Sequence, residues 1–192
     1  MNDTERTIEA TSYHMIFAIR RKKENRELKE MVFRQIVRDM ETDLAILKAR
    51  MSLHPGVWRI YHTVNKRLHK PAMKMLMKRL IDFPEDSYRI DTLFKTMMLK
   101  PECKASRHFL IDVDTKEKEK VDLLNSVLEV NKVTILHRAE TPNGFHIVTE
   151  KFDTRLIAGV TEISYQTDAY YLLDVVTIGG NEKWVLSQLI KL

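Results

Sequence analysis

The strongest constraint on the fold is the order in which helical and strand-like hydrophobic patterns follow one another along the chain. The helical patterns cover residues 24–51, 71–81, 90–99 and 116–129. The strand patterns cover residues 12–20, 57–65, 107–113, 132–138, 144–149, 160–166 and 169–178. Chains that mix the two periods in this way bury the apolar face of a sheet against helices. We therefore expect a single α+β domain over residues 1–192, with a central mixed or antiparallel sheet covered by helices.

The longest helical pattern lies near the N-terminus. Leu28, Val32, Ile36 and Met40 recur at steps of four, with charged residues between them. We expect a long N-terminal helix that ends where His54-Pro55-Gly56 makes a turn. With the strand at 12–20 it would form an N-terminal part, residues 1–55, packed on a core made of residues 56–192.

Composition excludes several classes of protein. Hydrophobic residues make up 44% of the 192 residues and charged residues 31%, a balance that excludes wholesale disorder. The single cysteine, Cys103, excludes a disulfide framework and a cysteine-rich zinc site. The longest apolar runs are about five residues, whereas a membrane span needs about 20. The first ten residues are too polar for a secretory signal peptide. We expect a soluble, cytoplasmic protein that makes no contact with a membrane.

Charge is distributed unevenly along the chain. Residues 1–107 hold 23 Lys and Arg against 14 Asp and Glu, whereas residues 108–192 hold 9 against 13. A basic half beside an acidic half suits a protein that holds a polyanion on one surface and divalent cations on another. Chance produces the same asymmetry about as readily.

Two carboxylates project together from the strand in FLIDVD, residues 109–114. Residues two apart on a strand share a face, so Asp112 and Asp114 lie opposite Phe109, Ile111 and Val113. Two carboxylates at a strand end are suitable ligands for Mg²⁺ or Mn²⁺. Asp114 could instead cap the next helix in a D-x-x-E arrangement with Glu117. Asp112, inside an apolar strand, requires a partner in either case.

Two later segments carry further polar residues on predicted strands. In TPNGFHIV, residues 141–148, a turn with Gly144 leads into a strand where His146 can contact a phosphate, although a lone histidine is more often structural. In AYYLLDVVT, residues 169–177, Asp174 is again an acid inside an apolar strand. Asp168 has the same parity and is the alternative to Asp174, although its position favours a turn.

The order of these motifs, hydrophobic-Asp112-x-Asp114, then Gly144-x-His146, then Leu173-Asp174, resembles the catalytic core of the archaeo-eukaryotic primase superfamily, the primase-polymerases. The resemblance covers roughly residues 57–178 and implies an RRM-like core. It implies that Asp112, Asp114 and Asp174 are catalytic and bind Mg²⁺ or Mn²⁺. It also implies that His146, joined by Asn143 and Arg138, contacts the nucleotide phosphates. The chain departs from many primases because it has no zinc-binding cysteine cluster and no arginine-rich stretch after Asp174.

A basic run follows the strand at 57–65. The polar side of that strand continues into a segment without acids up to Arg79, which favours a polyanion surface over an ordinary solvated helix face. We expect single-stranded nucleic acid to contact Arg59, Asn65, Lys66, Arg67, Lys70 and Lys74.

These features favour a small primase-like nucleotidyltransferase that uses nucleoside triphosphates on nucleic acid, of the kind carried by viruses, phages or mobile elements and working with replication proteins. The alternative is a non-catalytic module of the same fold that binds nucleic acid or a nucleotide. A replication-initiator nuclease would need a His-hydrophobic-His pair, and residues 146–148 supply only one histidine.

Overall fold

The computed structural model describes residues 12–158 and 160–179. The fold is α+β, as predicted, with two antiparallel sheets of four and five strands accompanied by helices. The chain divides into two compact units, and the division falls inside β1, β3 and β9. Within the described residues, one unit consists of 12–14, 63–158 and 160–171, and the other of 15–62 and 172–179. No helix in these ranges is both long enough and apolar enough to cross a membrane.

The smaller unit is a sheet with one helix packed on it. The strands follow the spatial order β2-β1-β3-β9, and their bounds are β1 (Ser12–Arg20), β2 (Met31–Val37), β3 (Gly56–Thr63) and β9 (Tyr170–Ile178). Helix α2 (Met40–Ser52) places Leu47 and Met51 against Trp58 and Ile60, and all four side chains are fully buried. Burial of this apolar surface is the main stabilising contribution to the unit.

The predicted long N-terminal helix is wrong. Residues 31–37 form strand β2, and α2 begins only at Met40. Asp39 caps α2 by accepting a hydrogen bond from the Thr42 backbone N–H at 2.8 Å. In β2 the Phe33 ring stacks on the Trp58 ring, with centroids 5.2 Å apart. The extended conformation lets Phe33 contact Trp58, which is distant in the sequence. This contact stabilises the strand more than the local hydrophobic pattern would stabilise a helix.

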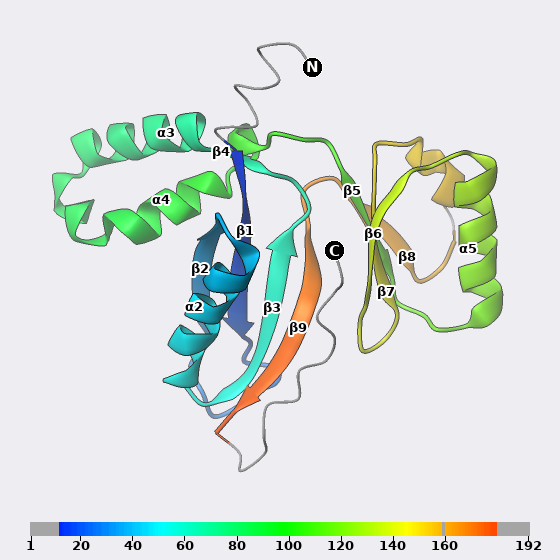
Figure 1. The fold of residues 1–192 in the computed structure, drawn as a ribbon, viewed down its shortest axis with the longest axis horizontal. Helices are drawn as coiled ribbons and strands as arrows, with labels where there is room; N and C mark the ends of the chain where they lie inside the picture. Colours follow the sequence, from blue (N-terminus) through cyan, green and yellow to red (C-terminus); the bar gives the residue numbers. More distant parts are fainter. Residues whose placement is uncertain (1–11, 159, 180–192) are drawn as a thin grey trace. The chain divides into compact units, whose positions relative to one another are not determined.

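The larger unit contains the second sheet and three helices. Its elements are β4 (Arg67–Leu68), α3 (His69–Asp82), η1 (Pro84–Arg89), α4 (Ile90–Met98), η2 (Pro101–Cys103), β5 (Phe109–Val113), α5 (Lys118–Val130), β6 (Ile135–Glu140), β7 (Phe145–Thr149), η3 (Thr154–Ile157) and β8 (Ile163–Gln166). The sheet order is β6-β7-β5-β8. Helix α5 covers one face of this sheet, where Leu124 and Leu128 pack against Ile111 and Ile147 (Figure 1).

His14 gives this unit a predicted dependence on pH. Its Nδ1 lies 3.0 Å from the Thr63 carbonyl oxygen, to which the neutral ring can donate. Burial, with smaller effects of nearby cationic groups, lowers the pKa of His14 from 6.5 to about 4. The unfolded chain protonates His14 at a higher pH than the folded chain does. The contribution of neutral His14 to the free energy of unfolding is therefore complete above pH 6.5 and is lost as the pH falls toward 4. The loss amounts to about 3 kcal/mol.

We expect His14→Asn, which keeps a side-chain N–H donor, to flatten the fall in unfolding free energy between pH 6.5 and 4. Urea unfolding of the variant and the original protein at several pH values in this window measures the difference. Equal slopes for the two proteins would contradict a neutral, buried His14.

Candidate nucleotide and metal site

Asp112 and His146 meet on neighbouring strands. The register of the antiparallel pair β5 and β7 places the two residues directly opposite each other. The His146 Nε2 lies 3.3 Å from the Asp112 Oδ1, and the side chains are 12% and 25% exposed. An imidazole and a carboxylate, 34 positions apart in the sequence, are thus adjacent and still reachable from solvent.

The face that carries this pair is the one turned away from α5. Ile111, Val113 and Ile147 belong to the core beneath α5, and the alternation of side chains puts Asp112 and His146 on the opposite face. The neighbours across the sheet are small, because Ser164 of β8 lies opposite Asp112 and Ala139 of β6 lies opposite His146. The carboxylate and the imidazole are therefore flanked across the sheet by small side chains.

Asp114 follows directly after β5 and is exposed. Its backbone N–H donates to the Glu162 carbonyl oxygen at 2.8 Å, which fixes the chain where β5 ends. The structure does not support the capping alternative for its side chain, since α5 begins at Lys118 with Glu117 as the N-cap and no side-chain cap. The side chain of Asp114 is therefore available as a second carboxylate two residues beyond Asp112.

Gly144 brings the turn before His146 close to the end of β5. A Cβ atom at this position would lie 1.8 Å from the Val113 carbonyl oxygen and 3.0 Å from the Thr115 backbone nitrogen. The group that approaches this glycine is the backbone at the end of β5. The glycine thereby positions His146 opposite Asp112.

Arg138 and Asn143 do not join His146 on its face of the sheet. Arg138 pairs in register with Ile147, and its Nη2 donates to the Asn125 Oδ1 of α5 at 2.6 Å. Strand alternation turns the Arg138 side chain toward α5 and away from His146, and its contact with a phosphate stays a prediction. Asn143 lies exposed in the turn before β7.

The two alternatives for a third acid have separate partners. Asp168 accepts two hydrogen bonds from Arg67, at 2.6 and 3.1 Å, within the larger unit. Asp174 belongs to the smaller unit, where its Oδ2 lies 3.0 Å from the Lys48 Nζ. The resemblance to the primase-polymerases favours Asp174, which stays a prediction as a metal ligand.

Three residues predicted to contact nucleic acid have polar partners within the protein. Arg67 is fully buried on Asp168, and a buried guanidinium requires such a bidentate partner. Asn65 is also fully buried, and its Oδ1 accepts from the His108 backbone N–H at 2.8 Å. Arg59 donates through Nε to the Glu24 Oε1 at 2.5 Å. Lys70 and Lys74 remain exposed on α3, and Lys66 is partly exposed.

The sequence patterns did not indicate His137 as a neighbour of the site. His137 lies opposite Val148 in the β6–β7 register, so it shares the face of His146. Burial lowers the pKa of His137, and its ring packs on Tyr171 with centroids 4.6 Å apart. A β-bulge between Ile135 and His137 shifts the register of β6, so alternation counted along the sequence could not place this ring.

Among the residues that the structure describes, no group of three or more His, Cys, Asp or Glu side chains is arranged to hold a metal ion. Of the three predicted metal ligands, Asp112 and Asp114 belong to the larger unit. This pair fits Mg²⁺, which commonly takes one or two protein carboxylates and completes its shell with waters and substrate phosphates.

No protein-family model, no curated protein and no solved structure matches the chain.

Proposed function

We propose that the protein is a primase-like nucleotidyltransferase that uses nucleoside triphosphates and a divalent cation on single-stranded nucleic acid. The observation that carries the proposal is the contact between Asp112 and His146, 3.3 Å apart on adjacent strands, with Asp114 two residues further along. Carboxylates for a cation and an imidazole for phosphates are the two kinds of group that a triphosphate site requires.

The connections of the larger unit support the same proposal. Strand β5 leads through α5 to β6, β7 returns beside β5, and η3 leads to β8 at the other edge. This β-α-β-β order with a spatial sequence β6-β7-β5-β8 is that of a split βαβ, or RRM-like, sheet. The primase-polymerase core expected from the motif order is built on a sheet of this type.

The residues would have separate roles at such a site. Asp112 and Asp114 would hold the cation, which when bound neutralises the triphosphate and favours attack by a 3′-hydroxyl. His146 would donate a hydrogen bond to a phosphate oxygen and orient it beside the carboxylates. Ser164 and Ala139 flank the pair on the two neighbouring strands and add no bulky side chain there.

We expect His146→Ala to weaken binding of a nucleoside triphosphate in the presence of Mn²⁺ about tenfold, because one charge-assisted hydrogen bond to phosphate is lost. Isothermal titration calorimetry measures the affinity. His137→Ala is the matched control, since it removes an imidazole from the same face one strand away. Equal losses in both variants would argue against a specific role for His146.

The second candidate is a module of the same fold that binds nucleic acid or a nucleotide without turnover. The observation that favours it is that two of the three predicted metal ligands already have basic partners, Asp112 with His146 and Asp174 with Lys48. In a binding module these pairs would be permanent.

Extension of a labelled primer on a single-stranded template, with Mg²⁺ or Mn²⁺ and all nucleoside triphosphates, separates the two candidates. The nucleotidyltransferase predicts extension that requires the cation. Salt-dependent binding of the template without extension under either cation would leave the binding module.

A further inference from the structure

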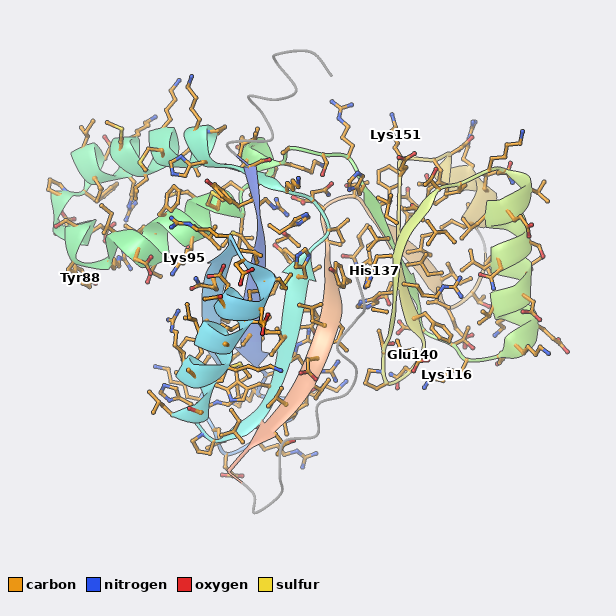
Figure 2. The ribbon with its side chains drawn as sticks, viewed as in Figure 1. Tyr88, Lys95, Lys116, His137, Glu140 and Lys151 are labelled. Atoms are coloured by element: carbon orange, nitrogen blue, oxygen red, sulfur yellow. The ribbon has the colours of Figure 1, made fainter. Side chains whose placement is uncertain are left out.

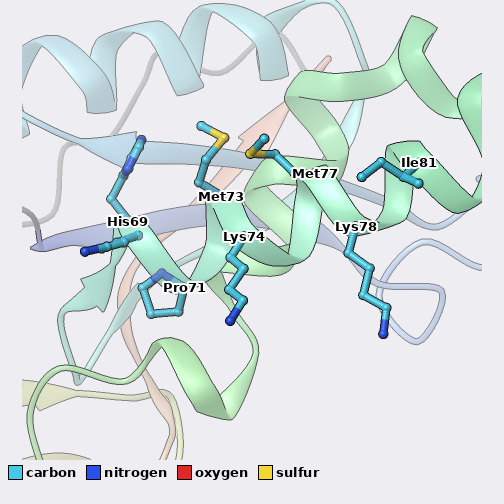
Figure 3. Close-up of a pocket in the computed structure, with 8 residues that line it drawn as sticks. His69, Pro71, Met73, Lys74, Met77, Lys78 and Ile81 are labelled. Carbon is cyan, nitrogen blue, oxygen red and sulfur yellow. The ribbon is translucent and has the colours of Figure 1, made fainter.

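The exposed side of α3 carries an apolar row beside a basic row. Each row contains residues four apart, which lie one above the other on a helix. The apolar row is Met73, Met77 and Ile81, and the basic row is Lys70, Lys74 and Lys78. Figure 3 shows the two labelled lysines, Lys74 and Lys78, pointing to one side of α3, and the two methionines together on another. The two rows line one open groove along the helix.

The basic row has no acidic counterpart in the described part of the chain. None of its three lysines forms an ion pair there, and all three are exposed. Like charges four apart destabilise a helix, and a cation in the first turn opposes the helix dipole. That turn contains no acidic residue and no side-chain cap. An anionic partner along this side would relieve both effects.

The apolar row is exposed to an extent unusual for side chains of its type. Met77 is 59% exposed and Ile81 is 76% exposed, whereas Ala72 and Leu76 on the other side of the helix are buried. Apolar side chains gathered in an open groove indicate a site that another surface covers. Methionine adapts its shape to different apolar partners, so this groove suits a protein side-chain surface.

We propose that this side of α3 docks an acidic amphipathic helix of a partner protein. Leucine-like side chains of the partner would cover Met77 and Ile81, and carboxylates beside them would pair with Lys74 and Lys78. Nucleic acid fits the groove less well, because strands with unpaired bases stack on aromatic rings. The groove contains no Phe, Tyr or Trp, and the His69 ring at its end already packs edge-on against Phe94, with centroids 5.0 Å apart.

The test uses a fluorescein-labelled synthetic helix with leucines at three- and four-residue spacing and glutamates beside them. Fluorescence anisotropy should show saturable binding to the full chain. Met77→Ala with Ile81→Ala should weaken it about tenfold, and Lys74→Glu with Lys78→Glu at least as much. A second peptide with lysine in place of glutamate should bind the charge-reversed protein better than it binds the original.

Matched controls are Leu123→Ala, an exposed leucine on α5, and Lys151→Glu, an exposed lysine away from α3 (Figure 2). Both should leave peptide affinity unchanged, and all variants should keep the melting temperature of the original protein. Failure of the peptide to bind, or binding that the α3 variants do not weaken, would overturn the proposal. The proposal would also be overturned if a labelled oligothymidylate bound in place of the peptide and lost its affinity in the Lys74→Glu and Lys78→Glu variant. If the protein self-associated and the Met77→Ala and Ile81→Ala changes dissociated it, the groove would instead bind a second copy of the chain.

Discussion

Asp112→Asn is expected to reduce cation-dependent primer extension by about 100-fold or more, while template binding stays nearly unchanged. The substitution keeps the shape of the side chain and removes its charge. A carboxylate that holds a cation acts on the charge that develops in the transition state, so its loss enters the chemical step rather than template binding. The melting temperature should change little, because the Asp112 side chain is partly exposed and an amide can still accept from the His146 Nε2–H.

The control for this experiment is Asp122→Asn, which removes a charge from an exposed position on α5. It should extend the primer at the original rate. Asp112 would be a structural acid if its substitution lowered the melting temperature and reduced extension only in proportion to the folded fraction.

Gly144→Ala is expected to destabilise the protein by about 3 kcal/mol or more, which corresponds to a fall in melting temperature of about 10 °C. The added Cβ would lie 1.8 Å from the Val113 carbonyl oxygen, a backbone atom held in the sheet. Relief requires β7 to move away from β5, which also separates His146 from Asp112. Thermal unfolding followed by circular dichroism measures the change.

Asn143→Ala is the matched control for Gly144, because it changes the adjacent and exposed residue of the same turn. Its melting temperature should stay within about 2 °C of the original. A Gly144→Ala protein that is equally stable would show that the turn accommodates a side chain, and the glycine would then have no positioning role.

The sequence predicted the local geometry of the site because one face of β5 is continuously apolar. Ile111 and Val113 mark the buried face, and strand alternation then fixes the side on which Asp112 lies. The bounds predicted for β1, residues 12–20, agree with the structure for the same reason. Where the hydrophobic pattern fits only a strand, the alternation of residues along it predicts the face on which each side chain lies.

Prediction failed where a distant residue decides the outcome. The sequence pattern predicted that Arg67 is one of a run of exposed cations. Arg67 is instead buried and pairs with Asp168, which lies 101 positions away. Residues 31–37 lie within the predicted helix, but they form a strand in which Phe33 stacks on Trp58. Both errors concern pairs brought together by the fold, and no local pattern records such a pair.

The pairing of β9 with β3 has a consequence for biosynthesis. No strand of the other sheet lies between β5 and β8 in the sequence, so their sheet can form as soon as these residues leave the ribosome. The smaller unit has to wait for β9, the last strand along the part of the chain that the structure describes, and until then the edge of β3 offers unpaired backbone groups to other strands. The nascent chain therefore exposes this edge of β3 to aggregation during the interval in which the larger unit is being translated.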